Sequence, residues 1–368
     1  MPLNGKIDLR SDTFTHPTPE MRKAMAESIV GDDVWEMDPT AKELEEYAAK
    51  LFGKQAALFM PSSCMANLAA VMAHTSGRGE EILVGDRSHI SLYEQGNVST
   101  IGGVHVRTLN NMDDGTFDLN ELEIKIRPPD NVHFPKTSLV CIETSHNMCS
   151  GSAVPIEFIE KVHAIVAPKG IKLHIDGARV LNSATALGIS PAEYVAKADS
   201  IACCLSKGLA APIGALLIGS VELIKKARHI RKALGGGMRQ VGVIACCGLI
   251  ALRDMSKRLH EDHANAKRLY EGISKIEGVI CGKPDTNIVK FSLDSSLYKN
   301  ANLSAITKIF EHENVYMITV DEGRSIRAVL HYHITSEDVD QAVRVVDKVL
   351  KGIREGSISV TTSNERLY

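Results

Sequence analysis

A lysine stands directly after an apolar segment in the middle of the chain. Residues 200–206 read Ser-Ile-Ala-Cys-Cys-Leu-Ser, and Lys207 follows them with Gly208 behind it. A lysine at the carboxyl end of a buried strand lies where open α/β sheets bind their ligands. Partial desolvation would lower the pKa of its amine and make it the nucleophile that Schiff-base formation requires. A solvated lysine in a strand-to-loop turn is the alternative that position alone leaves open.

An acid, a glycine and a base follow another apolar segment upstream. Residues 174–179 read His-Ile-Asp-Gly-Ala-Arg, so that Asp176 ends the apolar segment and Arg179 comes soon after it. An aspartate at a strand end can hold a pyridinium N–H and so keep a pyridine cofactor able to accept electrons. A helix N-cap aspartate beside an arginine would give the same pattern. Together with Lys207, in this order, the two residues indicate a pyridoxal-phosphate (PLP) site.

Short apolar segments that alternate with helical patterns must position these residues. Helical patterns occur, for example, at residues 155–166 and 221–234. The strand candidates are residues 56–60, 81–84, 104–109, 139–143, 172–175, 200–205 and 215–218. This alternation predicts an α/β fold with a doubly wound, mostly parallel sheet that is covered on both faces.

The pattern changes after about residue 254. A charged helix at 255–276 precedes short strands around 279, 288–293, 315–318 and 325–331, and a last helix runs from Ser336, as its N-cap, to about residue 353. We therefore expect an N-terminal segment and a large PLP-binding domain over residues 1–254, and a smaller C-terminal α+β domain over 255–354. The polar residues 355–368 are expected to form a flexible tail.

Composition excludes several classes of function. The net charge is −3 and the pI is about 6.5, so neither nucleic acid nor an anionic membrane is an expected partner. A secretory signal is not expected at the start of the chain, and the uncharged residues 55–77 contain too many polar side chains for a membrane span. Eight cysteines without C-x-x-C spacing predict neither disulfides nor a metal site. A cytoplasmic protein that acts on a small molecule is expected.

Seven short motifs occur in order between about residue 7 and about residue 350. They are 8–13 (Asp-Leu-Arg-Ser-Asp-Thr), 31–34 (Gly-Asp-Asp-Val), 143–147 (Glu-Thr-Ser-His-Asn), 174–179, 205–209 (Leu-Ser-Lys-Gly-Leu), 212–214 (Pro-Ile-Gly) and 235–240 (Gly-Gly-Gly-Met-Arg-Gln). With these motifs the chain resembles the low-specificity L-threonine aldolases, which are fold-type I PLP-dependent enzymes. The resemblance implies a PLP-dependent transferase-like fold and the cleavage of L-threonine or L-allo-threonine to glycine and acetaldehyde, within threonine catabolism and glycine biosynthesis.

The resemblance also assigns cofactor-binding residues. It implies that Lys207 forms the Schiff base with PLP, that Asp176 holds the pyridine nitrogen and that His89 stacks on the ring face. Ser63 and Cys64 open a helix whose N-terminal amides would bind the phosphate. The family has Gly-Thr at these two positions, and a thiol is a poorer donor to phosphate than a hydroxyl.

For the substrate, the resemblance implies that Arg327 binds the carboxylate, with Ser11 and Arg179 as helpers. Packing alone does not readily explain a charge within this apolar strand, and an outward-facing charge on an alternating strand is the alternative. His89 and His146 are the candidates for the base that takes the proton of the β-hydroxyl group. Trp35 stands where the family usually has tyrosine, beside the presumed pocket for the substrate side chain.

The resemblance further implies an assembly, a homotetramer built as a dimer of dimers. Lys232 and Arg239 match residues that the family offers to the phosphate in a neighbouring subunit, although a solvated helix end also explains Lys232. Two other functions remain open on the same scaffold. One is an amino-acid racemase similar to alanine racemase, and the other is a binding protein that has lost its activity.

Overall fold

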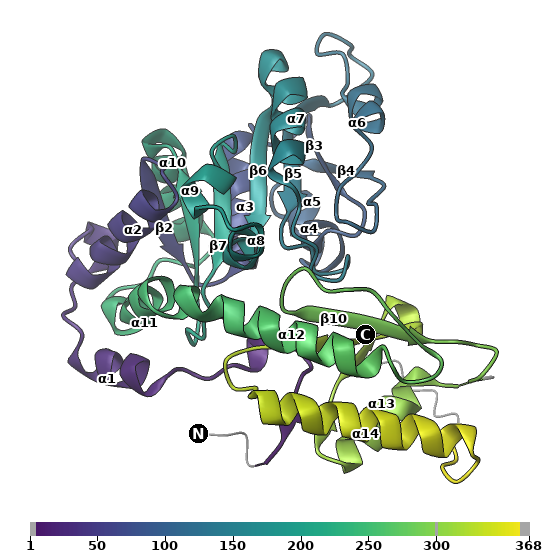
Figure 1. Ribbon diagram of the computed structural model, residues 1–368. Helices are drawn as coiled ribbons and strands as arrows, with labels where there is room; N and C mark the ends of the chain where they lie inside the picture. The colour runs from purple at the N-terminus through teal and green to yellow at the C-terminus, as the bar shows by residue number, and fades with distance from the viewer. Residues whose placement is uncertain (1–4, 299–300, 361–368) are drawn as a thin grey trace. The chain divides into compact units, whose positions relative to one another are not determined.

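The computed structural model describes residues 5–298 and 301–360, and the chain divides into two compact units (Figure 1). The larger unit contains residues 16–257, and the smaller contains residues 1–15 and 258–368. The sequence analysis grouped residues 1–15 with the large domain. In the structure, however, β1 (Ile7–Asp8) pairs in parallel with β11 (Val315–Tyr316) of the smaller unit. A strand of two residues carries too little pattern to reveal such a distant partner.

The larger unit is built on a seven-stranded sheet. In spatial order its strands are β2 (Ala56–Met60), β8 (Ala215–Gly219), β7 (Ser200–Cys204), β6 (Lys172–Gly177), β5 (Lys136–Glu143), β3 (Glu80–Gly85) and β4 (His105–Leu109). All are mutually parallel except β8, which is antiparallel to β2 and β7. Only residues 205–214 join β7 to β8, too few for the crossover that a parallel pair needs. The predicted α/β fold with a mostly parallel sheet is confirmed.

Helices cover both faces of this sheet. On one face α3 (Ser63–His74) and α10 (Val221–Ala233) pack on the strands through small and aliphatic side chains. α7 (Ile156–Val166) lies on the opposite face, in front of the sheet in Figure 1. The remaining helices of the unit are α1 (Pro19–Glu27), α2 (Pro39–Leu51), α4 (His89–Leu92), α5 (Asn97–Thr100), α6 (Leu119–Lys125), α8 (Val180–Leu187), α9 (Pro191–Tyr194) and α11 (Gly242–Arg253), with 3-10 turns η2 (Asp33–Trp35) and η3 (Ala167–Lys169).

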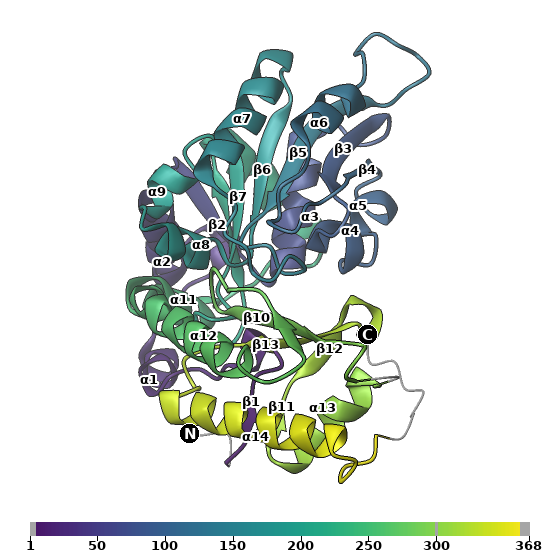
Figure 2. The same cartoon turned by 45° about the vertical axis from the view of Figure 1, so that its right-hand side comes forward.

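The smaller unit contains a four-stranded antiparallel sheet, visible in Figure 2. Its strands, in spatial order, are β12 (Ile318–Val320), β13 (Ser325–Val329), β10 (Ile288–Leu293) and β9 (Val279–Cys281). Its helices are α12 (Leu259–Ile273), α13 (Leu303–His312) and α14 (Ser336–Arg354), with 3-10 turns η1 (Asp12–Phe14) and η5 (Asp321–Gly323). The charged helix predicted at 255–276 is in fact the turn η4 (Met255–Arg258) followed by α12. The predicted α+β character is confirmed.

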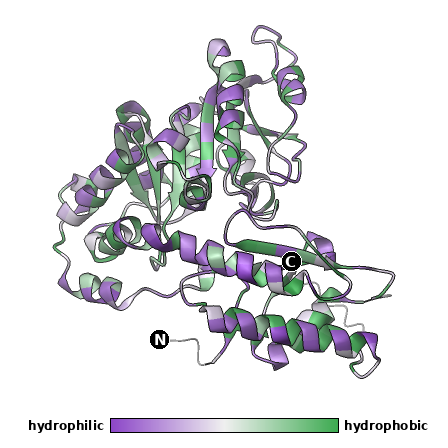
Figure 3. Ribbon diagram, in the orientation of Figure 1, coloured by the Kyte–Doolittle hydropathy of each residue, from purple (hydrophilic) through white to green (hydrophobic). Residues whose placement is uncertain are grey.

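The last helix, α14, is amphipathic and begins one residue earlier than predicted. Thr335, rather than Ser336, is the N-cap, because its side chain accepts from the amide of Asp338 while the Asp338 carboxylate accepts from the amide of Thr335. Apolar and polar residues alternate around the helix in Figure 3, and its apolar face joins the core of the unit. Within the predicted tail, the amides of Ser357 and Ile358 donate to the carbonyl of Gly352, and residues 361–368 lie outside the described residues. Among the described residues, no helix has the length and apolar character of a membrane span.

Candidate active site

The carboxyl ends of the parallel strands bring the predicted residues of the larger unit to one edge of the sheet. Glu143 ends β5 and pairs in register with Asp176 on β6. Lys207 follows the end of β7, and His89 begins α4 shortly after the end of β3. Because parallel strands end on the same side, this edge is where an open α/β sheet binds its ligand.

The buried side-chain amide of Asn67 connects the carboxylates of Asp176 and Glu94. Asn67, on α3, donates from Nδ2 to Asp176 Oδ2 at 3.0 Å and to Glu94 Oε1 at 2.8 Å. The same Glu94 oxygen lies 2.8 Å from Nδ1 of His89. The sequence analysis assigned no role to Asn67 or Glu94. An uncharged amide inside an alanine-rich helix was the available signal, because asparagine disfavours helix interiors.

Asp176 is buried among negative charges. Burial, followed by the charges of Glu143 and Glu94, raises the pKa of this carboxyl group to about 7. The charges of His89 and Lys207 act in the opposite direction. An N–H donor that carries positive charge would therefore be bound strongly at Asp176, because it would supply the countercharge that the site lacks. The pyridinium nitrogen of PLP fits this requirement.

Glu143 holds two segments of this edge in place. Its carboxylate accepts from the amide of His89 at 2.6 Å and from the amide of Asn147 at 2.9 Å. Burial acts to raise the pKa of Glu143, but the charge of His146 and these two amides outweigh burial and lower it. The sequence analysis included Glu143 only as part of a motif. The structure shows that its carboxylate fixes the backbone of both predicted catalytic histidine segments.

His146 lies at the same edge and is almost completely buried. Its Nδ1 is 4.0 Å from Glu143 Oε1, and neither ring nitrogen makes a hydrogen bond within the described part of the chain. Buried polar atoms without a partner are uncommon in folded proteins, so the two ring nitrogens of His146 call for an explanation.

The N-terminus of α3 also reaches this edge. Ser62 is the N-cap, and the buried hydroxyl of Ser63 makes no hydrogen bond to any described residue. Burial, followed by the charges of Glu94 and Asp176, raises the pKa of Cys64 to about 11, so the side chain is a thiol at neutral pH. Free backbone amides and an unpaired hydroxyl at a helix N-terminus suit a phosphate group. Cys64 also offers a sulfur atom within 4.8 Å of ligand atoms of His89 and Glu94, a grouping that the sequence did not reveal.

Close packing, rather than backbone conformation, explains Gly177, the glycine that follows Asp176. Its backbone does not adopt a positive φ. A Cβ atom at this position would instead lie 2.9 Å from the carbonyl oxygen of Ala202 and 2.9 Å from Cβ of Val180. The glycine is needed because β7 and α8 approach closely behind Asp176. Arg179, at the N-cap position of α8, is buried in the same region.

The residues predicted to reach a neighbouring subunit lie at the end of α10 and in the turn that follows it. Lys232 is an exposed residue near the end of α10, and Arg239 pairs with Asp32 at 2.9 Å. The backbone of Arg239 also accepts from the amide of Asp33, which ties the glycine-rich turn to η2. Trp35 ends η2, and 73% of its surface is exposed. In this chain Trp35 therefore presents its ring outward.

Ser11 and Arg327 belong to the smaller unit, where the structure brings them close together. Arg327 lies on β13 and donates to the carbonyl oxygen of Arg10 at 3.3 Å. The next residue, Ser11, is the N-cap of η1 and accepts from the amide of Thr13. Two of the three residues implied to bind the substrate carboxylate thus lie in one unit, on segments from opposite ends of the chain, whereas Arg179 belongs to the larger unit.

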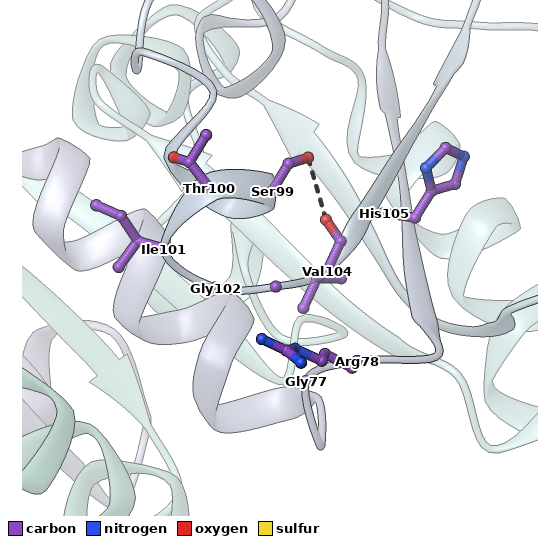
Figure 4. A pocket seen from close by; sticks show the side chains of 9 residues that line it. Gly77, Arg78, Ser99, Thr100, Ile101, Gly102, Val104 and His105 are labelled. Carbon is purple, nitrogen blue, oxygen red and sulfur yellow. Dashed lines mark hydrogen bonds between the residues drawn. The ribbon is translucent and has the colours of Figure 1, made fainter.

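A separate hollow of about 520 Å³ lies at the opposite ends of the strands, where β3 and β4 begin. Residues 77–78 and 99–105 line it, before β4 begins, and the hydroxyl of Ser99 donates to the carbonyl of Val104 across it (Figure 4). It contains none of the residues that the sequence analysis selected. The edge with Asp176 is therefore the better candidate for a catalytic site.

Comparisons with known proteins identify the family of the chain. The family model described as beta-eliminating lyase matches residues 8–296. The low-specificity L-threonine aldolase 1 of Arabidopsis thaliana is 43% identical over 354 residues, which cover 95% of this chain and 98% of that protein. The chain belongs to the low-specificity L-threonine aldolase family. The resemblance inferred from the seven motifs is therefore confirmed.

Solved structures extend the agreement from sequence to fold. The threonine aldolase of Leishmania major has a TM-score of 0.78 and 18% identity, with 94% of this chain and 99% of that chain covered. A structure described as SPT with PLP has a TM-score of 0.73 and 15% identity, with 96% of this chain and 89% of that chain covered. The predicted fold of the PLP-dependent transferase type is therefore confirmed for this member of the threonine aldolase family.

Proposed function

We propose that this chain is a PLP-dependent lyase that cleaves L-threonine or L-allo-threonine to glycine and acetaldehyde. The observation that carries the proposal is the buried cluster in which Asn67 joins Asp176 to Glu94 and thereby to His89. The charge of Lys207 acts on Asp176, so the lysine belongs to the same neighbourhood. When bound, PLP supplies an electron-accepting ring that stabilises negative charge on the α-carbon of an amino acid.

In this proposal the larger unit holds the cofactor. Lys207 would bind it covalently, Asp176 would accept a hydrogen bond from its ring nitrogen, and His89 would lie against the ring. The amides at the start of α3 hold the phosphate together with Ser63 and Cys64, and the unpaired Ser63 hydroxyl supports this assignment. Arg179 is buried and follows Asp176 closely in the sequence. It is assigned to the cofactor or to the substrate carboxylate.

The substrate is held by its carboxylate and loses a proton at its hydroxyl group. Arg327 offers the planar pair of donors that a carboxylate prefers, and Ser11 lies beside it. His89 or His146 accepts the proton of the β-hydroxyl while the bond between Cα and Cβ breaks, which releases acetaldehyde. A proton then returns to Cα and glycine leaves. The unpartnered ring nitrogens of His146 support its role as the proton acceptor.

A racemase on the same scaffold is the second candidate, because it needs the same cofactor residues. Racemisation needs one base on each face of Cα, whereas the predicted histidines serve a β-hydroxyl group. The names of the relatives also favour the aldol reaction. A binding protein without activity would have no need of the buried, charged cluster around Asp176, which is costly to maintain in a fold.

The product formed decides between these functions. Enzyme incubated with L-allo-threonine should release acetaldehyde and glycine in equal amounts, whereas enzyme incubated with L-alanine should yield little D-alanine. Both substrates are assayed at one enzyme concentration with added PLP. Abundant D-alanine without acetaldehyde would assign the chain to the racemases, and neither product would support a binding protein.

We further propose that the enzyme works in the cytoplasm as a homotetramer, a dimer of dimers. The eight free cysteines suit a reducing compartment. The exposed ring of Trp35 and the exposed side chains of Lys232 and Arg239 support a site that is completed by a neighbouring subunit. In such an assembly Trp35 would contact the substrate and the two bases would contact the phosphate in the neighbouring site.

Replacing Arg239 tests this shared site. Arg239→Ala should weaken PLP retention by about tenfold, the effect of losing one charged hydrogen bond, while the free energy of unfolding stays nearly unchanged. PLP affinity is measured by equilibrium dialysis, and assembly by sedimentation. Lys348→Ala is a suitable control, because Lys348 forms a comparable exposed ion pair in the smaller unit. A monomer that retains full activity would contradict the shared site.

The acid limb of the pH profile should report His89 if His89 is the base. Burial lowers the pKa of His89, but the hydrogen bond to Glu94 and the charges of Asp176 and Glu94 outweigh burial and raise it overall. A neutral base is lost as the pH falls through its pKa. The decline of kcat/KM on the acid side should therefore begin at a higher pH than the ordinary histidine pKa of about 6.5 would give.

Glu94→Gln should move this acid limb about one pH unit lower, because it removes the carboxylate that stabilises protonated His89. The profile of kcat/KM against pH measures the shift. Glu121→Gln, which alters a half-buried pair with Lys125 within one helix, should leave the limb in place. A limb unmoved by Glu94→Gln would indicate that His146, rather than His89, accepts the proton.

A further inference from the structure

A continuous chain of side-chain hydrogen bonds leads from His74, the last residue of α3, to Asp176. His74 Nε2 lies 2.8 Å from Ser200 Oγ, and the same hydroxyl lies 2.8 Å from His174 Nδ1. His174 Nε2 lies 3.1 Å from Oδ1 of Asn67, whose Nδ2 reaches Asp176 and Glu94. None of these contacts is needed to build the sheet, because all of them join side chains.

The chain follows from the periodicity of three elements. His74 and Asn67 are two helical turns apart on α3, and His174 and Asp176 are two residues apart on β6, so each pair projects to one side. Ser200 begins β7 and pairs in register with His174. Asn67, His174 and Ser200 are completely buried, so water does not compete for their hydrogen bonds.

Only one arrangement of protons satisfies every link. Because Nδ2 of Asn67 donates to two carboxylates, Oδ1 of the same amide must accept, and His174 must carry its proton on Nε2. Nδ1 of His174 then accepts from the hydroxyl of Ser200, which in turn accepts from Nε2 of His74. Burial lowers the pKa of His174 to about 3 and that of His74 to about 4, in agreement with two neutral imidazoles.

We infer that Asn67 and His174 are positioning residues for the cofactor site, with His174 fixing the orientation in which the Asn67 amide bridges Asp176 and Glu94. This inference rests on the proposed function. If the amide were absent or reversed, the two carboxylates would face each other without a donor between them. Asp176 would then be a weaker acceptor for the ring nitrogen of PLP, and His89 would lose the anchored position of its partner Glu94.

The affinity of the folded variants for PLP tests the inference. Asn67→Leu keeps the volume but removes the donors, and His174→Phe removes the Nε2–H. Both should weaken PLP binding about tenfold or more. His174→Gln retains an N–H at the same reach and should bind PLP within about threefold of wild type. Thr137→Val breaks another buried hydrogen bond of the same sheet, to Glu81, and serves as the control for a purely structural effect.

The outcomes separate the inference from the proposed function. Weak binding by Asn67→Leu and His174→Phe, with recovery in His174→Gln and unchanged affinity in Thr137→Val, supports the inference even if no acetaldehyde forms. Wild-type affinity in a folded Asn67→Leu or His174→Phe variant would overturn it, as would His174→Gln binding no better than His174→Phe. If Asn67→Leu does not fold, the two His174 variants decide. A wild-type chain that binds no PLP would overturn both the proposed function and the inference.

Discussion

Lys207→Ala is expected to abolish turnover, with a loss in kcat of at least about 10² to 10⁴-fold, the range for removing one positioned group that transfers protons. Lys207 is the only predicted residue with a covalent role, so no neighbouring side chain can replace it. Its position after β7 places it at the edge of the sheet where Asp176 and Glu143 are in register. The effect should therefore exceed that of any substitution in the hydrogen-bonding cluster.

The measurement combines the rate of acetaldehyde release with the detection of a covalent link to PLP. Borohydride should attach the cofactor permanently to the wild-type chain, seen as a mass increase on the peptide that contains Lys207, and should leave Lys207→Ala unmodified. Lys172→Ala is the matched control, because Lys172 starts the neighbouring strand β6 in an exposed ion pair with Asp199. Unchanged turnover in Lys207→Ala would exclude the lysine from the chemistry, and cofactor attached elsewhere would assign its role to another residue.

Asp33→Ala is expected to cause the largest loss of stability, about 3–5 kcal/mol, because it leaves a buried guanidinium without its countercharge. Arg231 is only 2% exposed, and it donates to Asp33 at 2.6 Å and to the carbonyl oxygen of Phe59 at 2.7 Å. Arg228 lies 3.7 Å from the same carboxylate and pairs with Glu45. The loss of Asp33 would therefore remove negative charge from the surroundings of both arginines on α10.

Urea unfolding at one protein concentration measures this effect, since assembly also contributes to stability. Asp33→Leu combined with Arg231→Met should recover most of the loss, because apolar residues of similar volume often replace a buried ion pair without cost. Asp113→Ala, which removes a fully exposed partner of Arg87, should leave the unfolding midpoint unchanged. If Asp33→Ala unfolds like wild type, Asp33 is not the countercharge that stabilises the buried guanidinium of Arg231.

The sequence by itself determined the seven strands of the large sheet, their order along the chain and the two residues nearest the proposed chemistry. Asp176 and Lys207 each follow an apolar segment, and strand ends can be read locally because an apolar run stops where the chain leaves the sheet. Their order, together with five other motifs, was specific enough to identify the family. The helices α7 and α10 also begin and end within about a residue of the predicted positions.

The tertiary structure alone decided which ordinary polar residues serve this site. Asn67, Glu94 and Glu143 come from three separate segments. Residues of these types are usually exposed on the protein surface, so their sequence positions did not indicate a role in the site. Their roles depend on contacts across the sheet, such as the bridge from Asn67 to Asp176, and on burial that strengthens those contacts. The same holds for β1, whose two residues become a strand only through β11. Local pattern specifies an element, whereas long-range pairing and desolvation specify what a side chain in that element does.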